Sequence, residues 1–325
     1  MNSNSSKQYQ KMDELSEKNV PFFFIIDFLQ NTILIFEDLE LSENSLLFDF
    51  QKDKIQKSVL DKKIEFQFQS YPESLNSYAE GFRIVQENIK LGNSYLTNYT
   101  RETSIKTSLS LEDIFHYSQA KYKILLKDKF VSFSPETFVE IKDDKIFTQP
   151  MKGTIDATIP NAAELLKEDK KEKAEHYTVV DLLRNDLSIV ANDVKVDHFQ
   201  RIDFLKTKQK NLFAMSSEIS GTLKPEFKNK VGSILKELLP AGSILGAPKQ
   251  KTLETILKAE KYDRGFYTGI AGFYDGRNLD SCVLIRYIEN RNGNLFFKSG
   301  GGITHLSKLE DEYQEMINKI YVPIY

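Results

Sequence analysis

The stretch GFYTGIAGFYDGRNLDSCVLIRYIENRNGNLFFKS, residues 265–299, decides the fold class. It predicts three strands, residues 265–274, 279–289 and 294–299, with Asp275-Gly276 and Asn292-Gly293 at the turns between them. Asp-Gly and Asn-Gly are pairs that tight hairpin turns favour. Consecutive strands joined by tight turns run antiparallel, so this part of the chain predicts an antiparallel sheet.

The rest of the chain repeats this pattern of strand runs separated by helices. Strands are predicted at residues 21–28, 32–36, 94–107, 121–133, 138–146, 147–155, 194–204 and 212–223, and helices at 75–91, 161–190, 227–238, 249–259 and 306–320. This order predicts an α+β fold, with large antiparallel sheets packed against each other and flanking helices. Residues 1–18, rich in Ser, Asn, Gln and Lys, are predicted to be a disordered leader, and residues 19–325 a single domain.

Composition excludes several classes of function. The 44 basic and 47 acidic residues nearly cancel, which argues against a nucleic-acid partner. The longest apolar run, residues 20–29, is interrupted by Asp27 and follows a polar leader, so it predicts neither a signal peptide nor a membrane span. The single Cys282 excludes an internal disulfide and suits a reducing cytoplasm.

Two pairs of glutamates are candidates for binding a cation. Glu172 and Glu175 lie three residues apart on one predicted helix, and Glu312 and Glu315 repeat this spacing on the last helix. Each pair therefore shares a helix face. Oxygen-only ligation favours magnesium, whereas a solvated, salt-bridged face is the alternative reading of the first pair.

Two glycine-containing stretches and one arginine each allow two interpretations, one as a ligand-binding element and one as a purely structural element. The backbone amides of residues 299–303 can approach an anion closely, or the glycines can form a flexible turn. The loop at residues 239–249, which ends at a helix start, has the same two readings. Arg286 is predicted to lie inside an apolar strand, where either a protein glutamate or a substrate carboxylate would pair with it.

Seven motifs in the expected order give the chain a resemblance to the chorismate-binding enzymes, over residues 75–325. That family includes anthranilate, aminodeoxychorismate, isochorismate and salicylate synthases. The motifs are Ser134-Pro135-Glu136, Pro150-Met151-Lys152-Gly153-Thr154, residues 172–190, residues 240–249, residues 264–269, Ile285-Arg286 and residues 300–319.

The resemblance implies a magnesium-dependent enzyme and assigns its site residues. Glu172, Glu175, Glu312 and Glu315 would form the Mg²⁺ site, with Glu175 and Glu315 as direct ligands. The substrate, chorismate, would be held by Thr154, Ser243, Tyr267, Arg286, Gly301, Gly302 and Lys319. A metal ion, cationic side chains and backbone amides suit the two carboxylates of this substrate.

Lys152 selects one reaction within the family. The resemblance to aminodeoxychorismate synthases implies that Lys152 attacks C2 of chorismate, while Glu136 acts as general acid and ammonia adds at C4. Isochorismate and salicylate synthases carry a general-base lysine where this chain has Leu96, which cannot activate water. Anthranilate synthase component I is the alternative. A catalytically silent chorismate-binding protein is a third reading, motivated by Ala214 and Leu245, which depart from the family pattern.

The same resemblance implies partners. Ammonia would come from a separate glutamine amidotransferase subunit, because a Cys-His-Glu glutaminase constellation is not apparent in this sequence. A separate aminodeoxychorismate lyase would release pyruvate from the product, on the way to 4-aminobenzoate and folate. We expect the protein to be cytoplasmic.

Overall fold

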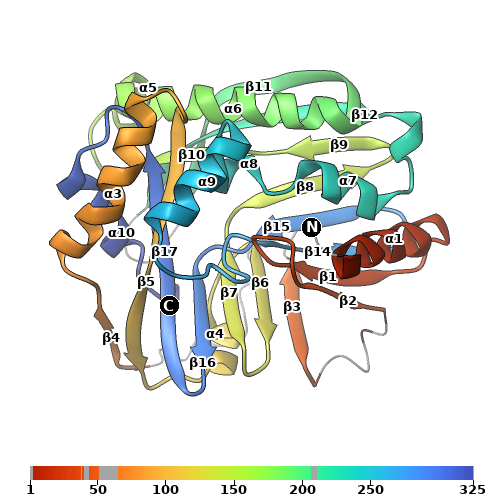
Figure 1. The fold of residues 1–325 in the computed structure, drawn as a ribbon, viewed down its shortest axis with the longest axis horizontal. Coiled ribbons are helices and arrows are strands. Elements are labelled where there is room, and N and C mark those ends of the chain that lie inside the picture. The colour runs from red at the N-terminus through yellow and green to blue at the C-terminus, as the bar shows by residue number, and fades with distance from the viewer. Residues whose placement is uncertain (1–2, 38, 40–43, 51–64, 206–210, 325) are drawn as a thin grey trace.

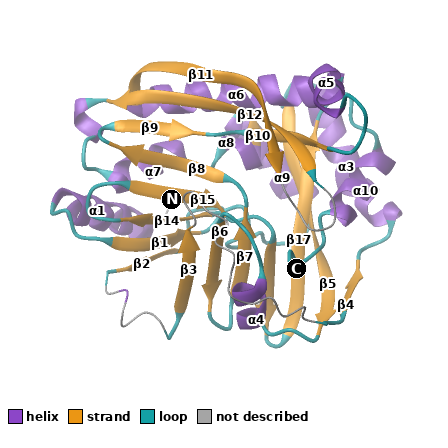
Figure 2. Cartoon of the chain, turned by 180° about the vertical axis from the view of Figure 1, so that it is seen from behind, coloured by secondary structure: helices purple, strands orange, loops and turns teal. Residues whose placement is uncertain are grey.

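The computed structural model describes residues 3–37, 39, 44–50, 65–205 and 211–324, with the backbone alone at Ser3, Thr154, Lys171 and Leu205. Figure 1 shows two sheets whose strands run in crossing directions, with helices on the outside. Figure 2 shows from behind that the long strands β11 and β12 run side by side along one end of the first sheet. The predicted α+β architecture of two packed antiparallel sheets is confirmed.

Within the described residues, the first sheet has nine strands in the order β10-β12-β9-β8-β15-β14-β1-β2, with β11 also paired to β12. The second has eight in the order β13-β5-β17-β16-β7-β6-β3, with β4 also paired to β5. Every described pairing is antiparallel. The first sheet comprises β1 (Phe22–Ile26), β2 (Ile33–Phe36), β8 (Thr137–Lys142), β9 (Lys145–Thr148), β10 (Met151–Asp156), β11 (Ala191–Leu205), β12 (Leu212–Leu223), β14 (Ile270–Tyr274) and β15 (Leu279–Val283). The second comprises β3 (Leu46–Phe50), β4 (Phe68–Tyr71), β5 (Leu96–Thr107), β6 (Tyr122–Leu126), β7 (Phe130–Ser134), β13 (Gly246–Ala247), β16 (Tyr287–Arg291) and β17 (Asn294–Ile303).

Helices cover the outer face of each sheet. Those packed on the first sheet are α1 (Ser3–Glu17), α6 (Lys170–Val190) and α7 (Val231–Leu238). The helices α8 (Gly242–Leu245) and α9 (Lys249–Ala259) contact β5 and β13 of the second sheet, and α8 also contacts α6. Those packed on the second are α3 (Leu75–Lys90), α4 (Leu111–Tyr117) and α10 (Leu309–Asn318). The remaining short helices are α5 (Ala162–Glu168) and the 3₁₀ turn η1 (Pro225–Phe227). A third apolar cluster joins the facing sides of the two sheets, so the layers alternate as helix, sheet, sheet, helix.

Strand β1 explains why an apolar run as continuous as FFFII occurs in an antiparallel sheet. All five of its residues are buried. Phe22 and Phe24 pack towards the helices of the first cluster, whereas Phe23 and Ile25 pack towards the second sheet. Successive side chains of a strand point to opposite faces, so a strand covered on both faces needs apolar residues at every position.

Two local predictions are confirmed in detail. The hairpin at residues 21–36 is formed by β1 and β2, with Gln30 at a φ of 60° in the turn. Helix α3 begins after Ser74, whose side chain accepts a hydrogen bond from the Ser77 N–H, and the chain turns at Gly92 with a φ of 74°. A glycine of positive φ is the usual residue just beyond a helix end.

The predicted disordered leader is wrong, because residues 3–17 form helix α1. Tyr9, Met12 and Leu15 are buried and belong to the same apolar cluster as α7. Ser16 is also buried, and its hydroxyl donates to the Asn229 carbonyl at 2.8 Å. Three apolar residues among polar ones give too weak a periodic signal to predict a helix that tertiary packing stabilises.

The predicted strand at residues 279–289 is also wrong, because the chain leaves one sheet and enters the other within it. Strand β15 ends at Val283 in the first sheet, and β16 begins at Tyr287 in the second. Arg286 lies in the connection with a φ of 51°, outside any strand. The apolar residues here continue across the connection because both sheets are buried on this side, and the sequence pattern therefore looks unbroken.

The glycines at residues 300–302 lie in a strand and not in a flexible turn. Strand β17 continues through them to Ile303, with Gly301 opposite Tyr99 and Gly302 opposite Asn98 on β5. Their φ values lie outside the left-handed region. The ladder with β16 ends at Lys298, so from Gly300 onward β17 pairs with β5 alone.

The predicted helix at residues 161–190 is divided at Asp169. Its side chain accepts a hydrogen bond from the Glu172 N–H at 2.9 Å, which caps α6 at the point where α5 has ended. None of the described helices is long and apolar enough to cross a membrane.

Met12→Ala tests whether α1 is part of the folded core. The Met12 side chain is fully buried, so its truncation should lower the free energy of unfolding by about 2–5 kcal/mol. Chemical denaturation of the full chain measures this change. Lys7→Ala, at an exposed position of the same helix, should change it by less than about 0.5 kcal/mol, and equal effects of the two variants would contradict the docking of α1.

Candidate functional site

The candidate site is built where the chain crosses between the two sheets. Glu136 lies between β7 of the second sheet and β8 of the first, and Arg286 lies between β15 and β16. These two crossings run side by side, because the Phe133 N–H donates to the Arg286 carbonyl at 3.0 Å and the Val283 N–H donates to the Glu136 carbonyl at 3.1 Å. Two residues 150 positions apart are thereby fixed next to each other.

Lys152, Ser243 and Glu136 form a connected polar chain. The Ser243 hydroxyl donates to Glu136 Oε1 at 2.5 Å, and Lys152 Nζ donates to the Ser243 carbonyl at 3.4 Å. Lys152 projects from β10, and Ser243 lies in the short helix α8. The structure therefore places the predicted nucleophile and the predicted general acid on either side of one buried serine.

Tyr267 lies near Glu136 and also near the positive charges of Arg264 and Arg286. Burial raises the pKa of the Tyr267 phenol, while the positive charges of Arg264 and Arg286 partly oppose this rise. The negative charge of Glu136 also raises the pKa of this phenol. Tyr267 is thus a neutral hydrogen-bonding group beside charges of both signs. The Arg286 guanidinium lies over the ring of Tyr321, with 5.4 Å to the centroid.

Three of the predicted metal-binding glutamates face the glycine segment of β17. A Cβ atom built at Gly301 would lie 3.1 Å from Glu315 Oε1 and 3.5 Å from Glu312 Oε2. A Cβ atom built at Gly302 would lie 3.2 Å from Glu175 Oε2. A side chain at either position would lie in tight contact with these carboxylates, which come from α10 and α6.

Lys319 holds the end of α10 against the same segment. Its Nζ donates to the Gly300 carbonyl at 2.8 Å and to Glu315 Oε1 at 2.7 Å. The exposed fraction of the Lys319 side chain is 27%. A partly exposed ammonium beside backbone amides is a suitable contact for an anion, as predicted for the substrate carboxylate.

Glu172 approaches the site from beside Lys152. A Cβ atom built at Gly153 would lie 2.8 Å from Glu172 Oε2, and Gly153 has a φ of 68°. The backbone of Thr154 pairs with Ala214 on β12, whereas its side chain is outside the described part of the structure. The fourth glutamate is therefore near the predicted nucleophile, on β10, rather than at the glycines of β17.

These carboxylates supply the type of donor atom that a hard divalent cation requires, since Mg²⁺ prefers oxygen. Three of them approach the glycines at positions 301 and 302. Among the described side chains, however, no group of three or more His, Cys, Asp or Glu is close enough to hold a metal. The magnesium site stays a prediction, and its ligands would have to draw together on binding.

His176 and Ser217 form a buried polar pair near Lys152 that the sequence analysis did not single out. His176 Nε2 and Ser217 Oγ are 2.7 Å apart, and the Gln200 N–H donates to the same hydroxyl. Burial and, to a smaller extent, the nearby charge of Lys152 lower the pKa of His176 to about 4. The imidazole is therefore neutral at neutral pH. Its place beside Glu175 in the sequence was the signal that could have found it.

Ala214 and Leu245, which depart from the family pattern, and Leu96, which stands where isochorismate and salicylate synthases carry a general-base lysine, are all buried. Leu96 lies against the glycine segment, since its Cδ1 would be 2.9 Å from a Cβ atom built at Gly302. Ala214 lies opposite Asp203 in the ladder between β11 and β12. Leu245 belongs to the apolar cluster of the first sheet. The structure thus puts a hydrocarbon side chain, and no base, at position 96.

Gly153→Ala tests the contact between β10 and Glu172. The substitution combines a φ that alanine adopts at a cost with a clash against a carboxylate oxygen, and we expect a loss of roughly 2–4 kcal/mol in unfolding free energy. Gly92→Ala is the matched control, because Gly92 has a φ of 74° with nothing within 4 Å of the built Cβ. Denaturation curves that show the same loss for both variants would mean that the contact with Glu172 contributes nothing.

Comparisons with known proteins show the family of this chain. A family profile described as "chorismate binding enzyme" matches residues 20–324. An "Uncharacterized PabA-like protein" of Haemophilus influenzae is 46% identical over 315 residues, which are 97% of this chain and 96% of that protein.

Two solved structures share the fold. Anthranilate synthase component I from Streptococcus pneumoniae is 26% identical, with a TM-score of 0.64, over 78% of this chain and 58% of that chain. The menaquinone-specific isochorismate synthase MenF from Escherichia coli is 16% identical, with a TM-score of 0.72, over 97% of this chain and 80% of that chain. The family resemblance predicted from the seven motifs is confirmed, and this chain belongs to the chorismate-binding enzymes.

Proposed function

We propose that this chain aminates chorismate at C4, producing 4-amino-4-deoxychorismate through a covalent adduct with Lys152. The observation that carries the proposal is the chain of contacts from Lys152 through Ser243 to Glu136. An amine and a carboxyl group held on either side of one residue can act on two positions of one substrate ring. Anthranilate synthesis needs no such lysine, which favours amination at C4.

The side chains divide the reaction between them. The neutral amine of Lys152 forms a bond to C2 as the ring double bonds shift and the C4 hydroxyl departs with a proton from Glu136. Ammonia then adds at C4, the double bonds shift back, and the bond from C2 to Lys152 breaks. Chorismate and ammonia are thereby converted to aminodeoxychorismate and water, and the enzyme returns to its starting state.

The substrate carboxylates would be bound by the groups around the crossings. Arg286, Tyr267 and Lys319 offer two positive charges and a phenol, and β17 is paired on one side only from Gly300 onward. Backbone N–H groups on its open edge would be available to an anion. Thr154 and Ser243 would add hydrogen bonds to the ring substituents.

Magnesium would be held by Glu175 and Glu315, supported by Glu172 and Glu312, and would neutralise a substrate carboxylate when bound. The support is the donor type and the approach of three of these carboxylates to the glycine segment. We further propose that ammonia comes from a glutamine amidotransferase subunit and that a separate lyase consumes the product. The second partner follows from the reaction, whose product still carries its enolpyruvyl group.

Product analysis tests the proposed function directly. The full chain incubated with chorismate, Mg²⁺ and an ammonium salt should yield 4-amino-4-deoxychorismate, identified by mass and by conversion to 4-aminobenzoate with added lyase. EDTA should stop the reaction and excess Mg²⁺ should restore it. Anthranilate or isochorismate as the main product would overturn the proposal, and tight chorismate binding without turnover would indicate a silent binding protein.

Lys152→Ala tests the covalent step. Loss of the nucleophile should lower kcat by at least about 1,000-fold and abolish the chorismate adduct seen by intact-protein mass spectrometry. Lys145→Ala, at an exposed lysine of β9, the strand that precedes β10 in the sequence, should leave both unchanged. An undiminished rate in Lys152→Ala would refute the nucleophilic role.

A further inference from the structure

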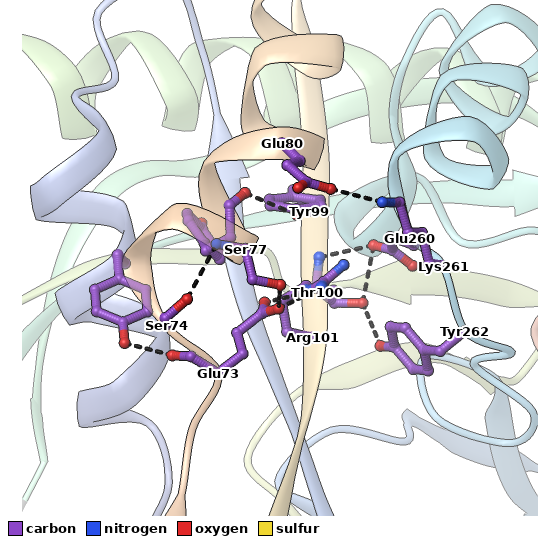
Figure 3. Close-up of polar contacts among 12 residues, drawn as sticks. Glu73, Ser74, Ser77, Glu80, Tyr99, Thr100, Arg101, Glu260, Lys261 and Tyr262 are labelled. Carbon is purple, nitrogen blue, oxygen red and sulfur yellow. Dashed lines mark hydrogen bonds and ion pairs between the residues drawn. The ribbon is translucent and has the colours of Figure 1, made fainter.

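A fully buried ion pair lies behind the proposed substrate site. Arg264 Nε and Nη2 donate to the two carboxylate oxygens of Glu260, each at 2.7 Å. Each side chain has 2% of its surface exposed. Glu260 also accepts hydrogen bonds from the N–H and the hydroxyl of Thr100, and that hydroxyl lies 2.6 Å from the Tyr262 hydroxyl (Figure 3). Both charges are thus paired and held in one orientation.

The remaining N–H groups of Arg264 reach three separate segments. Nη1 donates to the Ile244 carbonyl and to Thr268 Oγ1, both at 3.2 Å. Nη2 donates to the Asn98 carbonyl at 2.6 Å. One planar guanidinium, fixed by Glu260, therefore bonds to α8, to β5 and to the loop before β14.

Each of these contacts is next to a residue proposed to bind substrate. Ile244 follows Ser243 in α8. Asn98 is the ladder partner of Gly302. The Thr268 hydroxyl, which accepts from Arg264, donates to the Tyr267 carbonyl at 2.6 Å. Three segments of the proposed site, α8, β5 and the loop before β14, are therefore all hydrogen-bonded to Arg264, which is not itself proposed to touch substrate.

We propose that Arg264 is the positioning residue that fixes Ser243, Tyr267 and Gly302 relative to one another, an inference that rests on the proposed function of the site. A buried ion pair gives little net stability, because desolvation offsets the Coulomb attraction. Its geometric value is different. Arginine offers five donors in a rigid plane, whereas lysine offers one nitrogen and cannot hold all these acceptors in fixed directions.

A second Arg–Glu pair on the same strand provides a matched control. Arg101 of β5 makes two contacts with the carboxylate of Glu73, and Figure 3 shows this pair on the α3 side of the strand. The pair is mostly buried, with 13% and 18% of the side chains exposed. The pair also contacts Ser77 and Tyr313, and the Arg101 guanidinium lies 5.9 Å from the centroid of the Tyr99 ring. None of these residues is proposed to touch substrate. Arg101→Lys therefore disturbs a similar pair without disturbing the anchor.

The test compares Arg264→Lys and Arg101→Lys in the full chain by hydrogen exchange and steady-state kinetics. In Arg264→Lys, amides in residues 242–246, 266–270 and 300–303 should all exchange at least roughly tenfold faster. The same variant should lose roughly 100-fold in kcat/KM for chorismate. Arg101→Lys should leave exchange in the three segments and kcat/KM within about threefold of the wild type.

The outcomes separate this inference from the proposed function. If the wild-type chain does not convert chorismate, the proposed function fails, while hydrogen exchange still decides whether Arg264 anchors the three segments. Unchanged exchange in Arg264→Lys, or equal loosening in Arg101→Lys, would overturn the positioning role. If Arg264→Lys does not fold, Thr268→Val decides: it should speed exchange in residues 266–270 alone and raise KM, and unchanged exchange there would overturn the inference.

Discussion

The apolar layer between the two sheets is the constraint on which the rest of the structure depends. It includes Phe23 and Ile25 of β1 from one side and Ile124 and Phe130 from the other. Burying this layer requires the chain to pass from sheet to sheet, and each passage frees a few residues from strand pairing. Glu136 and Arg286 lie at two such passages. The fold thus produces the polar site as a consequence of closing its largest apolar contact.

The sequence predicted the fold class because the signals for it are local. Hairpin turns, strand alternation and helix ends depend on neighbouring residues, and β1, β2, α3 and α9 were found close to their actual bounds. The secondary-structure predictions were wrong where tertiary contacts determine the local structure. Helix α1 is stabilised by packing on α7, and the break at Arg286 depends on a second sheet that no local pattern reveals.

The candidate site was predictable to the extent that it is made of motif residues. Lys152, Ser243 and Glu136 lie in three different motifs, and the structure brings them into one chain of contacts. Spacing alone placed Glu312 and Glu315 on one helix face, but their approach to Gly301 depends on how α10 packs. The sequence did not reveal the proposed role of Arg264, because that role depends on hydrogen bonds to three acceptors from distant segments.

The paired crossings also limit how the site can open. Two backbone hydrogen bonds join them, from the Phe133 N–H to the Arg286 carbonyl and from the Val283 N–H to the Glu136 carbonyl. These bonds hold the two crossings together as one two-stranded connection between the sheets. A ligand must therefore reach the site with this connection between the sheets intact, and the four buried residues of α8, which Arg264 contacts through the Ile244 carbonyl, belong to the same frame.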